Sequence, residues 1–167
     1  MVRRSSIDYL NRLYGSLPYL LPIAAVVAFG AFLFLQFPQL ATVFLPVFYL
    51  NKMLSIPIID FISIRFVAWF CVFIFVVRSY KVNHFVRFNA LQALLLDIVV
   101  AIVGAITELL SIVVGNLPFF PFMLQIIASV TFLGITSAFI YSVFECIRGK
   151  YADKIPVISD IAYSQVR

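Results

Sequence analysis

The stretch from His84 to Val114 most constrains what this chain can fold into, because it leads from a basic loop into a long apolar run that also holds polar residues. A bilayer core needs about 20 consecutive apolar residues, so residues 88–114 can cross it as a tilted helix. Asn89, Gln92 and Asp97 lie in this run, although a polar side chain in hydrocarbon costs up to roughly 3 kcal/mol. A simple anchor would not require them, and we expect this helix to carry the function.

The composition is that of an integral membrane protein with a single domain over residues 1–167. Hydrophobic residues make up 64% and charged residues 11% of the chain, against roughly half and a quarter in soluble domains. The net charge of +5 does not indicate a nucleic-acid-binding protein, because the Lys and Arg residues lie at the ends of apolar segments rather than along one surface.

Four apolar segments predict an all-α integral membrane fold with four transmembrane helices. Their approximate ranges are 17–35, 61–77, 88–114 and 122–146. Shorter amphipathic helices at the membrane surface are expected over residues 5–16, 40–55 and 155–165. The middle one is either interfacial or re-entrant, because Pro38, Pro46 and Pro57 divide the chain there into pieces too short to cross a bilayer.

The distribution of positive charge predicts the orientation. In the four-span arrangement ten Lys and Arg residues lie on one side, Lys52 lies on the other, and Arg65 lies within a span. Loops on the cytoplasmic side carry an excess of Lys and Arg, so both termini should face the cytoplasm or its organellar equivalent. No small-residue cleavage site follows Arg3 and Arg4, and the first apolar run is expected to be retained.

One face of the segment 88–114 is small or polar from end to end. At about 100° per residue, Asp97, Gly104, Glu108 and Ser111 fall on the same side of the helix. Carboxylates are unfavourable in lipid, so this is a candidate path-lining or partner-binding face. The alternative is ordinary close packing of helices through small residues.

Depth in the membrane suggests a partner for one of these carboxylates. Arg65 and Glu108 should both lie in the outer half of antiparallel spans, within about one helical turn of each other in height, near 5 Å. We therefore expect an Arg65–Glu108 ion pair. Asp97 has no obvious basic partner at its own depth.

The sequence contains no recognisable catalytic or cofactor-binding motif. There is no nucleophile–base pair, phosphate-binding loop or metal-ligand spacing, and His84 is the only histidine. Cys71 and Cys146 are expected at different depths, which argues against a disulfide. We expect a protein that is not an enzyme and has no catalytic residues, metal or cofactor.

Several motifs resemble one known family. The chain has His-Phe-Val-Arg-Phe-Asn-Ala-Leu-Gln-Ala at 84–93 followed by Leu-Leu-Leu-Asp-Ile at 94–98, Leu-Pro-Tyr-Leu-Leu-Pro at 17–22, Val-Val-Arg at 76–78, and Ile-Pro-Val-Ile-Ser-Asp-Ile-Ala-Tyr at 155–163. In this order they resemble the twenty-kilodalton subunit family of the chloroplast inner-envelope translocon, Tic, with its cyanobacterial and plastid-encoded relatives. Leu91 departs mildly, where the family pattern has Met.

The resemblance implies a four-helix subunit of protein-import machinery with both termini on the stromal or cytoplasmic side. It implies a plastid inner envelope or cyanobacterial plasma membrane, the lipid bilayer and other translocon subunits as partners, and a translocating polypeptide or further copies of the chain as additional ones. His84, Arg87, Asn89, Gln92 and Asp97 are the family motif at the inner end of the third span. The alternatives are a structural scaffold or assembly factor and, with less support, a small-solute channel, because no inverted repeat is evident.

Overall fold

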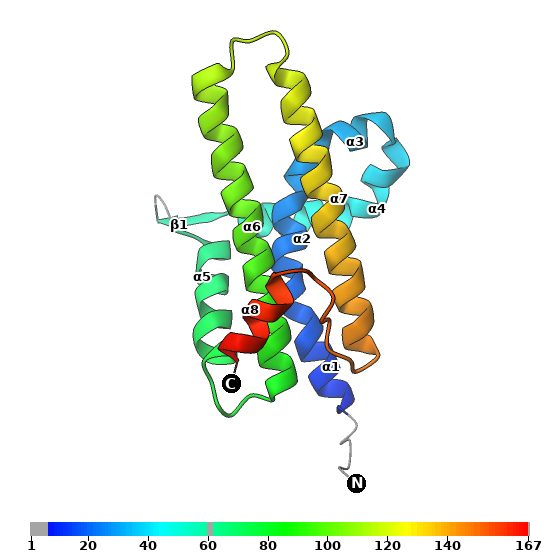
Figure 1. Cartoon of the computed structure of the whole chain (residues 1–167), viewed down its shortest axis with the longest axis vertical. Helices are drawn as coiled ribbons and strands as arrows, with labels where there is room; N and C mark the ends of the chain where they lie inside the picture. Colours follow the sequence, from blue (N-terminus) through cyan, green and yellow to red (C-terminus); the bar gives the residue numbers. More distant parts are fainter. Residues whose placement is uncertain (1–6, 60–61, 167) are drawn as a thin grey trace.

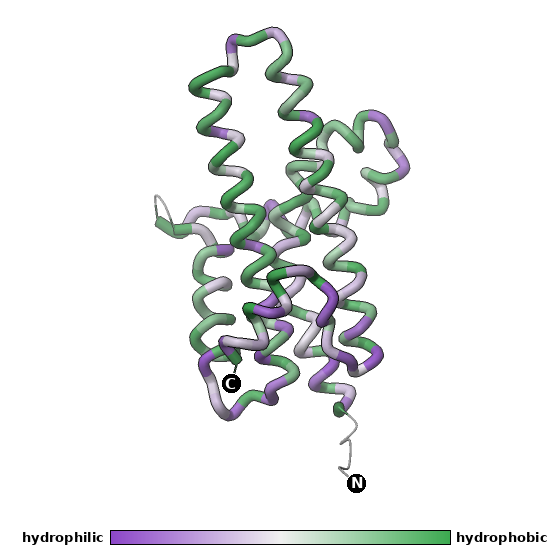
Figure 2. Tube along the Cα trace, in the orientation of Figure 1, coloured by the Kyte–Doolittle hydropathy of each residue, from purple (hydrophilic) through white to green (hydrophobic). Residues whose placement is uncertain are grey.

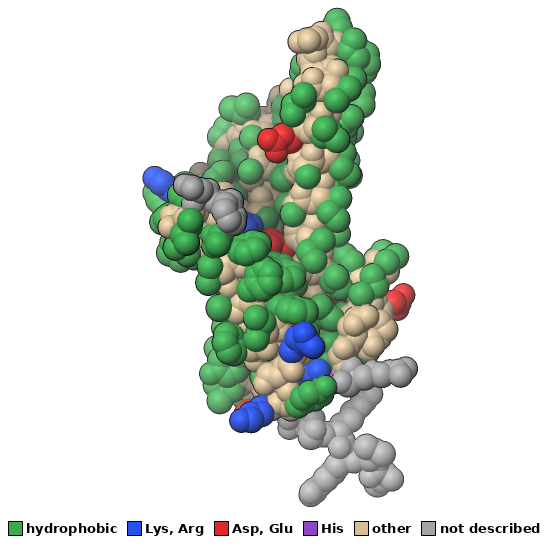
Figure 3. Space-filling view, turned by 90° about the vertical axis from the view of Figure 1, so that its left-hand side faces the viewer, with side chains coloured by type: hydrophobic (Ala, Val, Ile, Leu, Met, Phe, Trp, Pro, Cys, Tyr) green, Lys and Arg blue, Asp and Glu red, His purple; other side chains and the backbone are tan. Residues whose placement is uncertain are grey.

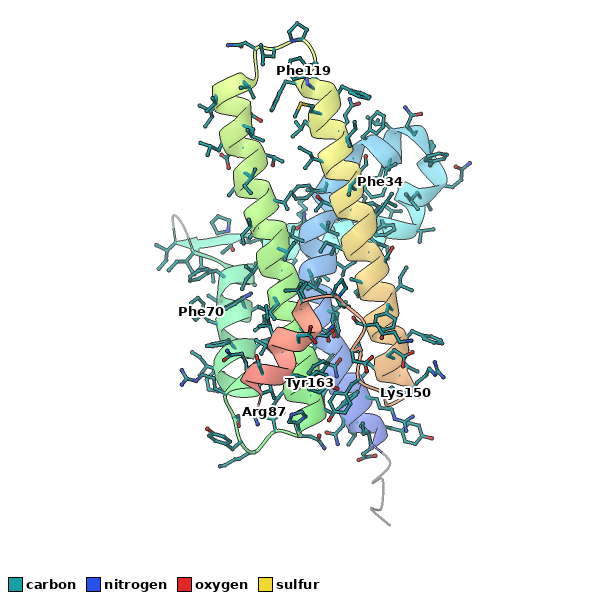
Figure 4. The ribbon with its side chains drawn as sticks, viewed as in Figure 1. Phe34, Phe70, Arg87, Phe119, Lys150 and Tyr163 are labelled. Atoms are coloured by element: carbon teal, nitrogen blue, oxygen red, sulfur yellow. The ribbon has the colours of Figure 1, made fainter. Side chains whose placement is uncertain are left out.

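The computed structural model describes residues 7–59 and 62–166, which are mostly helical (Figure 1). Within these described residues, three helical segments are long and apolar enough to cross a membrane: Tyr9–Gln36, His84–Val114 and Phe120–Ile147. The architecture is therefore mostly helical, in line with the predicted all-α class, but the count of four spans is not confirmed. Figure 4 shows Phe119 at one end of the molecule and Arg87 and Lys150 at the other, which we call the outer and inner ends.

The first long segment joins two elements that the sequence suggests are separate. It consists of α1 (Tyr9–Ser16), η1 (Leu17–Tyr19), α2 (Leu20–Val26), η2 (Val27–Gly30) and α3 (Ala31–Gln36). The expected interfacial helix 5–16 is helical from Tyr9 and continues directly into the expected span 17–35, while its residues 5 and 6 lie outside the described residues. Pro18 and Pro22 do not interrupt the segment, because Pro18 lies in the first turn of a short 3-10 stretch that tightens the helix there.

The region between the first two apolar segments lies across the bundle rather than along it. It contains α4 (Pro38–Leu54), which begins at a proline, holds Pro46 within it, and crosses behind the long helices about halfway along them (Figure 1). A small antiparallel hairpin follows, made of β1 (Pro57–Ile59) and β2 (Ile62–Ser63). The expected segment 40–55 is thus a single helix.

The expected second span is the shortest of the apolar helices. It runs through α5 (Ile64–Cys71) and the π-helical η3 (Val72–Val77). At about 1.5 Å per residue this segment measures roughly 21 Å, less than the ~30 Å hydrocarbon core. It lies beside the inner half of the next long helix and leaves the outer half of that helix uncovered (Figure 1).

The last two long helices form a hairpin that reaches beyond the rest of the molecule. They are α6 (His84–Val114) and α7 (Phe120–Ile147), and they contain the expected spans 88–114 and 122–146. After α7 the chain folds back along α6 and ends in α8 (Ile158–Gln165), within the expected segment 155–165. The projecting outer ends are mostly hydrophobic in Figure 2, with a few hydrophilic positions, whereas the inner loops are largely hydrophilic.

Most of the packed core lies in the inner half of the molecule, and an aromatic cluster of Phe34, Phe44, Phe48 and Phe132 extends it outward between α3, α4 and α7. Two clusters of buried side chains surround α6, one against α2 and α7 and the other against α2, η3 and α8. Their largest fully buried members include Tyr19, Phe85 and Phe88. In contrast, Leu109, Ile112 and Phe122 on the outer hairpin are mostly exposed. The fold therefore consists of a compact inner half and an open outer half, and each holds a group of polar residues.

Candidate functional site

The amide side chains of the family motif form the centre of a buried hydrogen-bond network. Asn89 and Gln92 on α6 are fully buried. The Tyr19 hydroxyl from η1 lies 3.1 Å from Asn89 Oδ1 and 3.1 Å from Gln92 Oε1, and its single hydrogen is shared by these two acceptors. Asn89 Oδ1 also accepts from the Cys146 thiol of α7 at 3.1 Å. The network thus connects three helices through groups that would be costly to bury unpaired.

The same network attaches the C-terminal tail, residues 148–166, to α6. Gln92 Nε2 donates to the carbonyl oxygen of Ala152 at 2.9 Å and to Ser159 Oγ at 3.2 Å. The Ser159 hydroxyl in turn donates to the Ala152 carbonyl at 3.0 Å. Ala152, Ser159 and Ala162 are buried, so the tail is packed as part of the domain. A single glutamine is therefore hydrogen-bonded to both the start of the tail and α8.

The two remaining residues at the start of the motif lie around the first turn of α6. Arg87 Nε donates to the carbonyl oxygen of Val77 at 2.9 Å and so satisfies the end of η3. His84 Nδ1 lies 3.1 Å from the Tyr151 hydroxyl in the tail. Asn83 precedes them as the helix cap, with its Oδ1 accepting from the Phe85 amide at 2.9 Å. These contacts fix the inner end of α6.

Replacing Tyr19 with Phe should reduce the free energy of unfolding by about 1–2 kcal/mol. The substitution keeps the ring but removes the donor, and the buried Gln92 Oε1 then loses its hydrogen bond. The measurement is thermal unfolding of the purified protein in detergent. Tyr14→Phe, at an exposed position of α1, is the matched control and should leave stability unchanged. Equal effects of the two substitutions would contradict the assigned role of the network.

A second polar cluster joins α4, α5 and α6 near the middle of the molecule. Arg65 Nη1 lies 3.4 Å from Asp97 Oδ1, and it also donates to the carbonyl oxygen of Leu21 at 3.4 Å. Arg65 Nη2 donates to Asn51 Oδ1 at 2.8 Å. The guanidinium of Arg65 thus connects α5 with α2, α4 and α6. Both side chains of the ion pair are largely buried.

The expected Arg65–Glu108 ion pair is therefore replaced by an Arg65–Asp97 pair. The sequence places Arg65 near the outer surface, on the assumption that its helix crosses the whole membrane. In the structure α4 and the β hairpin lie about halfway along the long helices (Figure 1). The next helix, α5, therefore begins at the same level, one residue before Arg65. Glu108 is three turns further along α6 and is exposed. The expectation that Asp97 lacks a basic partner was wrong for the same reason.

The candidate path-lining face of α6 is divided between the two halves of the molecule. Asp97 is buried against Arg65, and Gly104 is half-buried, with Phe29 Cζ 3.7 Å from the position a Cβ would occupy. Glu108 and Ser111 are exposed, and the Ser111 hydroxyl donates to the Thr107 carbonyl of its own helix at 2.8 Å. One end of the face therefore packs within the chain, and the other end lies open.

The inner end carries a cavity of about 1100 Å³ between α1, the end of α7 and the tail. Charged side chains of both signs line it: Asp8, Arg12, Glu145, Arg148, Lys150, Asp153 and Lys154. Burial raises the pKa of Tyr151, another lining residue, above its ordinary value. Within residues 7–59 and 62–166, no group of three or more His, Cys, Asp or Glu side chains could hold a metal ion.

Comparison with known proteins places these residues in a family context. A family model described as "Chloroplast import apparatus Tic20-like" matches residues 5–162. A Tic20 family protein of Synechocystis sp. is 33% identical over 168 residues, covering 100% of this chain and 99% of that protein. Protein TIC 20-II, chloroplastic, of Arabidopsis thaliana is 36% identical over 60% of this chain and 47% of its own length. The Tic20 family protein Ycf60 of Pyropia yezoensis is 27% identical, covering 93% of this chain and 75% of that protein.

Proposed function

This chain belongs to the Tic20-like family of the chloroplast import apparatus, and we propose that it is a membrane subunit of a protein-conducting complex. Its role in such a complex is to help form or support the path for preproteins across the plastid inner envelope or the corresponding cyanobacterial membrane. The single observation that carries the proposal is the open outer part of α6. Glu108 is exposed there among apolar side chains, on a helix long enough to span a bilayer.

An exposed carboxylate at this position requires a polar neighbour that the described part of the chain does not provide. Hydrocarbon is a poor environment for the Glu108 side chain, so a partner subunit, water or a translocating polypeptide should cover it. The inner half of α6 is already enclosed by α2, α7, α8 and η3. The outer face is therefore where a conducting complex would make contact with this subunit.

The proposed topology keeps four crossings, with both termini on the stromal or cytoplasmic side. The positive charges of Arg78, Lys81, Arg87, Arg148 and Lys150 gather at the inner end, and α5 with η3 is antiparallel to α6. Residues 64–77 are short for a span, and local thinning of the bilayer or cover from a partner subunit would accommodate them.

A scaffold that carries no path of its own is the second candidate function. The network around Asn89 and Gln92 favours it, because these motif residues are fully buried and hydrogen-bonded within the fold, where they support packing and do not line a path. On this alternative a resident partner subunit would permanently cover the outer part of the α6 face that carries Glu108. The two candidates differ in whether a moving polypeptide reaches that face.

Photo-crosslinking should distinguish them. A crosslinking amino acid at Glu108 should capture a preprotein arrested during import into membranes that contain the full complex. Ile106 is the matched control, because it lies on the opposite side of the same helix and is similarly exposed. We expect adducts with the arrested preprotein from position 108 and not from 106. Adducts with resident membrane proteins only, unchanged by the arrested chain, would identify a scaffold instead.

A further inference from the structure

We infer that the outer part of the Asp97–Ser111 face lines a water-filled recess that enters the membrane from the outer side and ends at the Arg65–Asp97 pair. The inference concerns where water lies around the resting protein. It requires that the chain is inserted in a membrane, and it does not require that a polypeptide moves through it.

The ion pair lies close to the middle of the membrane-spanning part. Along α6, Asp97 is about 20 Å from the start of the helix at His84 and about 26 Å from its end at Val114, at ~1.5 Å per residue. A hydrocarbon core of ~30 Å leaves roughly half of its thickness on either side of such a position. Polar headgroups therefore do not reach Arg65 and Asp97 directly.

The pair is nevertheless not sealed within the protein. The side chain of Arg65 is 20% exposed and that of Asp97 is 10% exposed. Ionised groups that touch hydrocarbon at mid-membrane are expensive, whereas contact with water removes most of this cost. The exposed parts of the pair therefore indicate that water reaches this depth.

The arrangement of the helices gives water a route from the outer side. Since α5 begins at Ile64, no part of it covers α6 above the ion pair. Gly104, Glu108 and Ser111 continue the face of Asp97 upward, one above the other. Figure 3 shows this side of the molecule, where the surface is hollowed between the outer part of α6 and the lobe of α3 and α4. Acidic and basic side chains reach the surface at the floor of the hollow.

The recess does not continue to the inner side. Nearly every residue of α6 from Phe85 to Leu96 is buried. Its polar members there, Asn89 and Gln92, are hydrogen-bonded to other groups of the protein. The described part of the chain therefore encloses a dead end, wet on the outer side and closed at the depth of Arg65.

Single-cysteine labelling in sealed vesicles tests this inference. The background carries Cys71→Ser and retains the buried Cys146. Gly104→Cys, Glu108→Cys and Ser111→Cys report on the recess, and a Cβ at Gly104 would make only ordinary contact with Phe29. Ile102→Cys, Ile106→Cys and Val113→Cys are matched controls, because they are exposed at similar depths on the opposite side of α6. The probe is a membrane-impermeant, charged methanethiosulfonate added to either side.

We expect recess positions to react at least about tenfold faster than their controls, because the thiolate that reacts forms only in contact with water. The reaction should occur only when the probe is added on the side opposite the basic loops. Gly104→Cys is decisive, since it is the deepest of the three recess positions, about 10 Å from Asp97 along α6. Protection of position 104 in correctly folded protein, equal rates on both sides of the helix, or labelling from the inner side would each overturn the inference. None of these outcomes depends on whether preproteins crosslink at Glu108.

Discussion

Replacing Arg65 with Met is expected to lower the free energy of unfolding by roughly 3–5 kcal/mol. The substitution leaves the Asp97 carboxylate largely buried without its ion-pair partner. It also removes the donor to Asn51 Oδ1 and so loosens the attachment of α4 to α5. The loss should be measured as a lower unfolding temperature in detergent and an earlier transition in a denaturant titration.

The double variant Arg65→Met/Asp97→Leu is the main control. Removing both charges together replaces a buried ion pair by apolar side chains, which is often close to neutral for stability. We expect the double variant to recover most of the loss, so that the two substitutions are strongly non-additive. Lys52→Met removes an exposed positive charge from the end of α4 and should have little effect. Additive losses, or an Arg65→Met variant as stable as the parent, would show that the pair does not hold these helices together.

The long helices were predictable from sequence because their signals are local. Twenty or more apolar residues in a row determine a membrane-length helix almost regardless of what surrounds it. The predicted ranges 88–114 and 122–146 lie within α6 and α7, whose ends extend a few residues further. The helical wheel correctly placed Asp97 and Gly104 on one face, because this periodicity follows from the helix itself.

The height of each element was not predictable in the same way, because it depends on tertiary contacts. The prolines of residues 36–60 indicated a broken segment, but they do not show that α4 crosses the bundle at mid-height. That one feature moves the start of α5 down and changes the partner of Arg65 from Glu108 to Asp97. Tyr19, Asn51 and Ser159 were missed as polar partners, since a tyrosine, an asparagine and a serine in separate segments carry no sequence signal of proximity.

The predicted motif residues between His84 and Asp97 have two different structural roles that the sequence could not separate. Asn89 and Gln92 lie on the buried inner half of α6 and bind Tyr19 and the tail. Asp97 marks the boundary at which the packed half of the helix ends. Glu108, beyond the motif, lies on the open half. The same helix therefore holds the fold together at one end and offers a polar surface at the other.

Replacing Gln92 with Leu should release the C-terminal tail and make it sensitive to protease. The substitution keeps the size of the side chain but removes its hydrogen bonds to Tyr19, Ala152 and Ser159. At about 1 kcal/mol for each bond, docking of the tail should weaken by about 2–3 kcal/mol. When cleavage follows the population of released tail, a factor of ten for each 1.4 kcal/mol predicts about 30- to 140-fold faster cleavage by trypsin after Lys150 and Lys154.

Gln165→Leu is the matched control, because it makes the same change on the exposed side of α8 and should leave the cleavage rate unaltered. The long helices should stay intact in both variants, since α6 and α7 also pack through the apolar cluster around Phe85 and Phe132. Faster cleavage confined to the tail would show that Gln92 holds it in place from within the membrane domain. If Gln92→Leu is cleaved no faster than Gln165→Leu, the buried apolar contacts of Ala162 and Val166 are sufficient to hold the tail.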